Sequence, residues 1–244
     1  METLCFQSFS EPTEKPWGTI FYNPNLLERH DANHAEVVEP SLSNSILPEI
    51  NEFYSAKKIP SRLNYYDPDG NSSFRETLIQ SDFVNVDKNE KTTFMKLETA
   101  ISLTALLNDS DDNLRVSFSP SLIFDSPIGE DVKTILLAEW PYQNLVSHPF
   151  YYYFILYDQS EPVSILSFYL SEQFNLARLD DVVTPEKHRK KGYATFLLKF
   201  ASNWVQDNEF KPYLFVTNPV AKRVYEEVGF EEVFACEKCH WLKE

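Results

Sequence analysis

The chain has 244 residues, of which 43% are hydrophobic and 15% aromatic, and its formal net charge is −15. So many apolar side chains can fill packed cores, which excludes a chain that is disordered throughout. The negative charge argues against general binding to nucleic acid or anionic lipid, because phosphate groups repel such a surface.

No segment approaches the ~20 continuous apolar residues of a membrane-spanning helix, so we expect no membrane association. The first residues lack the basic and apolar regions of a signal peptide, and three cysteines are too few for a disulfide framework. We therefore expect a cytoplasmic protein without a nucleic-acid partner.

A polar and acidic segment at 108–113 contains no apolar residue and predicts a domain boundary. We expect one domain over residues 1–107 and a second over 114–244. The second part alternates strand-like and helix-like segments, which predicts an α/β domain with a mixed sheet. The expected strands are 114–118, 151–157, 162–170, 176–183 and 213–216; the expected helices are 131–140, one from Gly192 and one from 219 to Gly229; a hairpin is expected at 230–242.

Residues 74–86 can be laid over residues 221–233 without gaps, which suggests an internal repeat. The overlay matches Leu78 with Tyr225, Asp82 with Gly229, Phe83 with Phe230 and Val86 with Val233. Phe94 and Trp241 each follow eleven residues after the matched phenylalanine. The repeat predicts that the first half keeps the fold but has lost the chemistry, because it lacks a basic loop with glycine.

A basic loop follows the strand at 176–183 and leads into an amphipathic helix. The first turn of a helix offers unpaired N–H groups and a partial positive charge, so it can hold an anion. Gly192 and the small Ala194 leave room for a diphosphate to approach the backbone. Arg189, Lys190 and Lys191 add full charges, and the loop predicts a diphosphate cradle.

A second block, from Asn218 to Phe230, starts 24 residues after this cradle. The two blocks together resemble the GNAT superfamily of acetyl-CoA-dependent N-acetyltransferases, over about residues 114–244. The loop carries Lys190-Lys191 where many members have a further glycine, and it ends in alanine. The resemblance implies a GNAT-like mixed sheet flanked by helices, and a degenerate GNAT-like N-terminal half.

The resemblance also implies roles for individual residues. The diphosphate of acetyl-CoA would lie on the loop, and pantetheine and the acetyl carbonyl on the end of the strand. The tyrosine of the later helix would protonate the leaving thiolate, and the asparagine at its start would touch the cofactor. The residues implied are Arg189, Lys190, Lys191, Gly192, Tyr193 and Ala194 for the loop, Val182, Val183 and Thr184 for the strand, Tyr225 for the acid, and Asn218.

Two carboxylates, Asp180 and Asp181, lie on the strand beside the expected acetyl site. Alternation along a strand points them to opposite faces, so one could accept the proton of an amine directly or through water. An Asp with an ordinary pKa of ~3.9 is a poor base near neutral pH. The alternative is that one anchors the loop and the other is solvated.

Two patterns resemble metal-binding motifs: the pair His30 and His34, and the run Cys236-Glu237-Lys238-Cys239-His240. Neither has the accompanying ligands that such motifs need, so we expect no metal. The sequence thus favours transfer of an acetyl group to a small-molecule or peptide amine. It leaves open a CoA-binding sensor without turnover, and transfer of a longer acyl or an aminoacyl group.

Overall fold

The computed structural model describes residues 10–67, 73–86, 91–99, 113–119, 127–139 and 152–244. The chain folds into two compact units: residues 1–93 with 235–244, and residues 94–234. This division differs from the expected boundary near residue 108, because strands of each half belong to the other unit. Among the described helices, none is both long enough and apolar enough to cross a membrane.

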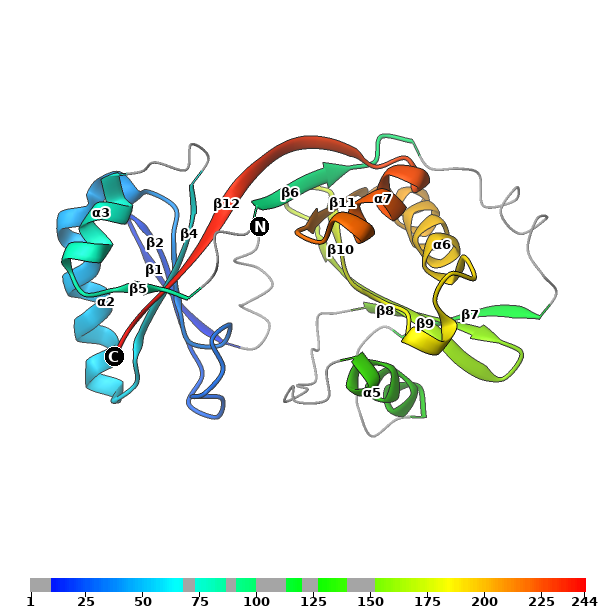
Figure 1. Cartoon of the computed structure of the whole chain (residues 1–244), viewed down its shortest axis with the longest axis horizontal. Coiled ribbons are helices and arrows are strands. Elements are labelled where there is room, and N and C mark those ends of the chain that lie inside the picture. The colour runs from blue at the N-terminus through cyan, green and yellow to red at the C-terminus, as the bar shows by residue number, and fades with distance from the viewer. Residues whose placement is uncertain (1–9, 68–72, 87–90, 100–112, 120–126, 140–151) are drawn as a thin grey trace. The chain divides into compact units, whose positions relative to one another are not determined.

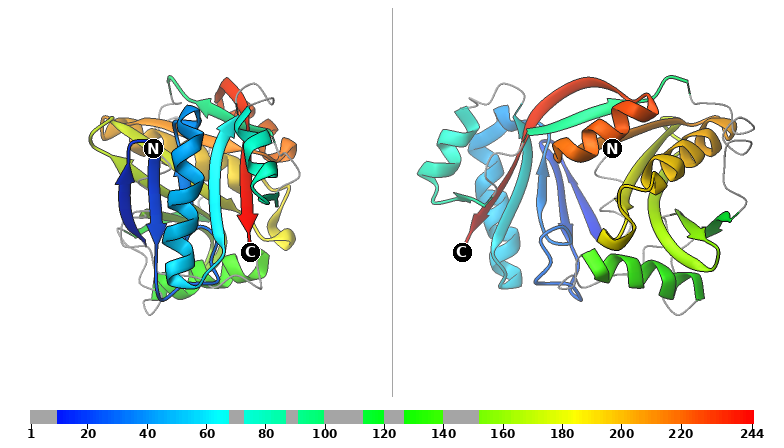
Figure 2. Two further views of the ribbon diagram at one scale, coloured as in Figure 1. Left: turned by 90° about the vertical axis from the view of Figure 1, so that its left-hand side faces the viewer. Right: turned by 45° about the vertical axis from the view of Figure 1, so that its right-hand side comes forward.

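The first unit is a mixed sheet with two α-helices on one face (Figure 2). Its strand order is β1-β2-β3-β4-β12, and β5 also pairs with β12. Only β3 and β4 are parallel; the other pairs are antiparallel. Its core contains Trp17, Ile50, Tyr54 and Trp241. Its elements are β1 Glu11–Lys15, β2 Gly18–Tyr22, β3 Ala35–Val37, the short helix η1 Pro40–Leu42, α2 Ser43–Lys57, β4 Ser61–Asp67, α3 Ser73–Gln80, β5 Val84–Asn85 and the end of β12 Glu231–Lys243.

The second unit is also a mixed sheet, in the order β12-β6-β11-β10-β9-β8-β7 (Figure 1). Neighbours from β7 to β10 are antiparallel, whereas β10 and β11 are parallel. Buried residues of α6, among them Leu197, Leu198 and Val205, pack on this sheet. The elements are β6 Lys91–Lys96, β7 Leu114–Ser119, α5 Pro127–Glu139, β8 Tyr152–Asp158, β9 Glu161–Ser171, β10 Leu176–Val183, the short helix η2 Glu186–His188, α6 Tyr193–Asp207, β11 Lys211–Val216 and α7 Pro219–Val228.

Most expected elements of the second half are present within a few residues of their predicted bounds, and the strand at 176–183 agrees at both ends. The terminal hairpin is wrong: residues 231–243 form the single strand β12. No glycine, proline or asparagine interrupts this run, so it lacks the usual turn residues, and other segments of the chain supply its partner strands. The expected boundary segment at 108–113 lies largely outside the described residues.

The two units repeat one order of elements. The first runs β1-β2-β3-η1-α2-β4-α3-β5, and the second runs β8-β9-β10-η2-α6-β11-α7-β12. In both, a parallel pair of strands follows two antiparallel pairs, and a short helix precedes the long one.

The C-terminal ends of α3 and α7 also match in their hydrogen bonds and backbone angles. The N–H of Phe83 donates to the carbonyl of Leu78 at 3.0 Å, and Phe230 donates to Tyr225 at the same distance. The preceding residues have left-handed φ angles in both units, 64° for Asp82 and 106° for Gly229. These matches support the duplication that the sequence predicts.

The first repeat continues from β5 into β6, as the second ends with β12, and the later part of each of these two strands belongs to the other unit. Phe94 on β6 belongs to the second unit, where its ring lies 5.4 Å from the rings of Tyr213 and Phe215. The matching Trp241 on β12 belongs to the first unit, where it pairs with Leu63 of β4 and is buried. The units therefore exchange their terminal strands.

Candidate functional site

The pairing of β10 with β11 in the second unit ends partway along both strands, and we call the stretch beyond the last pair the opening. The parallel pairing covers only residues 176–178 of β10 and 211–213 of β11. β10 continues to Val183 and β11 to Val216, so both strands run on beyond their last ladder pair among the described residues. Backbone groups at the end of β10 are thus available to something other than β11.

A β-bulge lies at the start of this opening. Asp180 pairs with Ser167 and Val183 with Ile165, so β10 has one residue more than β9 between these two pairs. Asp181 in the bulge has a φ of 41°, in the left-handed region that residues with side chains seldom adopt. Such local strain is found at functional sites more often than elsewhere.

The basic loop follows directly on β10. Gly192 precedes α6 with a φ of 81°, and no side chain caps the helix at this position. A Cβ added to Gly192 would meet no atom within 4 Å. The start of α6 thus combines uncapped N–H groups with a glycine whose missing side chain leaves open space, which fits a diphosphate.

One charged side chain of the loop bonds to the backbone, and two others are exposed to solvent. Arg189 donates from Nε to the carbonyl of Thr184 at 3.1 Å, which ties the loop to the end of β10. Lys190 and Lys191 are exposed. The φ of Lys190 is 62°, so the backbone turns sharply here as well. The two lysines provide positive charge beside the N-terminus of α6.

Tyr193 is directed away from this open space. Its side chain is buried, and its hydroxyl donates to Asp158 Oδ2 at the end of β8. Only the backbone N–H of Tyr193, and not its side chain, could therefore contact a cofactor. Ala194, the next residue, is half-buried in the first turn of α6.

Asn218 begins the second helix of the motif pair. Its Oδ1 accepts hydrogen bonds from the N–H groups of Val220 at 2.8 Å and Ala221 at 3.4 Å. This is the N-cap that the sequence predicts, followed by Pro219 in the first turn. The cap uses the amide oxygen, so contact with a cofactor would fall to the amide nitrogen.

Tyr225 lies on α7, half-buried against the core of the second unit. Burial raises the pKa of its phenol above the ordinary value of 10.0, and the negative charges of Asp180 and then Asp181 raise it further. The charges of both aspartates thus act on the phenol of Tyr225, the third residue predicted for catalysis. The phenol keeps its proton at neutral pH and can donate a hydrogen bond.

The two aspartates differ in their partners. Asp180 Oδ2 lies 3.0 Å from Arg178 Nη2, and Asp180 Oδ1 accepts the N–H of Asp181 at 3.2 Å. Asp181 accepts a hydrogen bond from Ser167 Oγ at 3.0 Å. Both oxygens of Asp180 are therefore engaged, one of them by a guanidinium.

The end of β10 is held from β9. Val183 is buried, and its carbonyl accepts a hydrogen bond from Ser164 Oγ at 3.1 Å; Val182 packs at the edge of the core. Sequence reasoning missed Ser164, Ser167 and Arg178. The serines carry one weak signal, because they interrupt an otherwise apolar strand, but nothing in the sequence shows that they bond to β10.

Residues 117–230 match the model of the acetyltransferase (GNAT) family. The chain carries a GNAT domain. A comparison with curated proteins finds no match.

Solved structures resemble the whole chain. A GCN5-related N-acetyltransferase from Kribbella flavida superimposes with a TM-score of 0.71 at 11% identity, over 99% of this chain and 92% of that one. One from Sphaerobacter thermophilus gives 0.62 at 11% identity, over 100% and 85%. A tandem GNAT protein from the clavulanic acid biosynthesis pathway gives 0.59 at 11% identity, over 86% and 75%. At these identities the likeness shows the fold alone.

The first unit carries no counterpart of the basic loop of the GNAT domain. Between β3 and α2 stand residues 38–42, which contain Glu39 and neither glycine nor a basic residue. Ser41 donates to the Glu39 carboxylate at 2.5 Å. A negative charge at this position disfavours a diphosphate.

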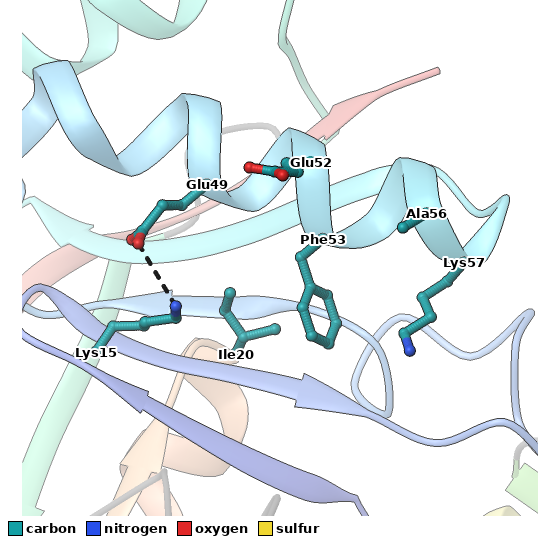
Figure 3. A pocket seen from close by; sticks show the side chains of 7 residues that line it. All are labelled: Lys15, Ile20, Glu49, Glu52, Phe53, Ala56 and Lys57. Atoms are coloured by element: carbon teal, nitrogen blue, oxygen red, sulfur yellow. Dashed lines mark hydrogen bonds and ion pairs between the residues drawn. The ribbon is translucent and has the colours of Figure 1, made fainter.

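A separate pocket of about 320 Å³ lies in the first unit, beside α2 (Figure 3). Figure 3 shows Lys15 directed at Glu49, whose carboxylate it meets at 3.5 Å. Trp17 Nε1 donates to the same carboxylate at 2.5 Å, and this hydrogen bond is the main cause of the lowered pKa of Glu49. No sequence motif pointed to this pocket. It is lined by Lys15, Ile20, Glu49, Glu52, Phe53, Ala56 and Lys57.

The two metal-like patterns of the sequence meet in the first unit. His30 Nε2 lies 3.0 Å from Asn64 Oδ1 and 3.4 Å from His240 Nδ1, and the rings of His30 and His34 stack. His34 Nε2 lies 3.1 Å from a carboxylate oxygen of Glu36. Within the part of the chain that the structure describes, no group of three or more His, Cys, Asp or Glu has an arrangement that could hold a metal ion.

Proposed function

We propose that the GNAT domain transfers an acetyl group from acetyl-CoA to an amine, which attacks directly while both substrates are bound. The observation that carries this proposal is the opening between β10 and β11. It begins at the bulge beside Tyr225, and β10 then leads into the uncapped helix start at Gly192. One continuous segment of backbone thus supplies both a catalytic end and an anion-binding end.

The cofactor would be held mainly by backbone. The exposed charges of Lys190 and Lys191 would attract the diphosphate to the helix N-terminus, where N–H groups would bind it. Arg189 would secure the loop through Thr184. The residues assigned to the cofactor are Val182, Val183, Thr184, Arg189, Lys190, Lys191, Gly192, Tyr193 and Ala194, with Asn218 from α7.

The role of Tyr225 follows from its raised pKa. A thiol has an ordinary pKa of about 8.5 and a phenol of about 10. Proton transfer from the phenol to a thiolate is therefore uphill by at least about 2 kcal/mol, and more when the pKa of the phenol is raised. We assign Tyr225 the donation of a hydrogen bond to the leaving sulfur, which lowers the energy of the charge that develops there.

Asp181 is the better of the two candidates for accepting the proton of the amine. Both carboxylate oxygens of Asp180 are already engaged, one by the guanidinium of Arg178 at 3.0 Å and the other by the N–H of Asp181. The negative charges of both carboxylates raise the pKa of Tyr225, so they act at the same site. Together they would attract the positively charged form of an amine. The net charge of −15 would also attract such an amine to the protein from a distance.

The test measures release of thiol from acetyl-CoA across a panel of amines, together with calorimetric titration of CoA. We expect turnover with at least one amine and one CoA bound per chain, because the loop of the first unit carries Glu39 in place of a basic cradle. Binding without turnover for every amine would instead favour a sensor or scaffold module. Two CoA molecules per chain would refute the assignment of a degenerate first unit.

A further inference from the structure

Two buried serines on β9 hold the end of β10 in place. Ser164 and Ser167 are fully buried in a strand whose other central residues are apolar. A buried hydroxyl is costly unless it is hydrogen-bonded, so its partners show what it stabilises. Ser164 Oγ bonds to the carbonyl of Val183 and to the Oγ1 of Thr184, and Ser167 Oγ bonds to Asp181. These partners lie on β10 or just beyond its end.

The geometry points to Ser164 and Ser167 as positioning residues that fix the two ends of the bulge, and hence the backbone that receives the cofactor. This inference rests on the proposed function. Ser167 donates to the carboxylate of Asp181, the residue with the left-handed φ. A carboxylate held in this way keeps the bulged backbone from relaxing into a regular ladder.

Ser164 acts at the other end. Its hydroxyl proton goes to the carbonyl of Val183 at 3.1 Å, so toward the Oγ1 of Thr184, at 2.9 Å, it acts as the acceptor. In a planar trans peptide the C=O and the next N–H point in opposite directions. With the carbonyl of Val183 held toward β9, the N–H of Thr184 points away from β9, toward the side on which β11 has parted. Ser164 thus aims a backbone donor into the opening.

The two serines should therefore have different effects. Ser164→Ala frees the peptide at the cofactor end, so we expect a roughly tenfold higher Kd for CoA and a kcat within twofold of the wild type. Ser167→Ala frees Asp181 beside Tyr225, so we expect a roughly tenfold lower kcat and an unchanged Kd for CoA. A merely structural role would lower stability without this division between binding and turnover.

The matched control is Ser202→Ala, because Ser202 is an equally buried serine of the same unit and lies on α6 rather than on β9. It should change stability without changing kcat or the Kd for CoA. If Ser164→Ala does not fold, Ser164→Cys keeps the volume of the side chain with a weaker donor and should show the same rise in Kd. Equal effects of Ser164→Ala and Ser202→Ala on the Kd would overturn the inference.

Amide hydrogen exchange of the ligand-free protein separates this inference from the proposed function. Ser164→Ala and Ser167→Ala should raise exchange at residues 181–184 several-fold and leave residues 176–179 of β10 unchanged. Unchanged exchange at 181–184 would refute the positioning role, whatever the activity. Raised exchange in a protein that never binds CoA would support the role of the serines and refute the proposed function instead.

Discussion

Gly192→Ala adds a single methyl group at the start of α6. It tests the cofactor cradle, because it should weaken the binding of CoA while the protein stays folded. Gly192 has a φ of 81°, and a Cβ at this position would meet no atom within 4 Å. The methyl group therefore enters the space in front of the uncapped N–H groups, where we place the diphosphate, without disturbing the packing of the protein.

The magnitudes follow from these two facts. A left-handed conformation costs a residue with a side chain about 1–2 kcal/mol, which is small beside a domain stability of about 5–15 kcal/mol. Blocking one or two hydrogen bonds from N–H groups to a charged ligand costs about 1.5–3 kcal/mol each. We expect Gly192→Ala to remain folded and its Kd for CoA to rise about tenfold to a hundredfold or more.

The assay is calorimetric titration of CoA at one fixed salt concentration, beside urea unfolding of each variant. Gly229→Ala is the matched control, since Gly229 has a φ of 106° and its added Cβ would lie 3.2 Å from Leu97 Cδ1. It should lose at least as much stability as Gly192→Ala while its Kd stays within twofold. If Gly192→Ala binds CoA as tightly as the wild type, the cradle has been assigned to the wrong backbone.

Four further outcomes are expected. Tyr225→Phe should lower kcat about tenfold to a hundredfold with the Kd for CoA unchanged; unchanged turnover would exclude its role as donor. Trp241→Ala should lower the free energy of unfolding by about 3–5 kcal/mol, because the side chain is buried in the first unit; a loss below 1 kcal/mol in urea unfolding would contradict this. Asp82→Gly should stabilise the protein by about 0.5–1 kcal/mol, because it relieves a left-handed φ of 64°; a lower unfolding midpoint would argue against it. Burial lowers the pKa of His30 and brings that of His240 to about 3, so the unfolded chain binds more protons below pH 6.5. Stability should therefore fall as the pH drops below 6.5, by up to about 1.4 kcal/mol per pH unit from His240 down to about pH 3, and His30 should contribute in the same direction. Urea titrations can measure this slope, and His240→Asn should reduce it.

The helices and strands of the GNAT domain could be predicted because their signals are local. The cap at Asn218, the glycine at 229 and the apolar spacing along α6 each depend on a few neighbouring residues. The fate of residues 230–242 depends instead on partners far away in the chain. A strand paired with β4 and a strand of a hairpin have similar sequences, so the hairpin was a reasonable but wrong expectation.

In the candidate site, too, local features could be predicted from the sequence, whereas contacts between side chains could not. Glycine and basic residues pointed to the cradle because diphosphate binding needs those residue types. The inward orientation of Tyr193 depends on Asp158 at the end of β8, and the engagement of Asp180 depends on Arg178, two residues before it. The sequence does not show that these side chains meet, and the same holds for the serines of β9.

The exchange of terminal strands bears on how the protein is made. Residues 235–243, which complete the first sheet, leave the ribosome only after the whole GNAT domain has been synthesised. β4 ends at Asp67 and β12 at Lys243. At roughly 5–20 residues per second, β4 and the apolar face that Trp241 covers are therefore without their partner strand for about 9–35 seconds during synthesis. Cutting the gene between the two halves would leave one fragment without β12 and the other without β6. Co-expression of both fragments, rather than of either alone, is then the way to recover the native sheets.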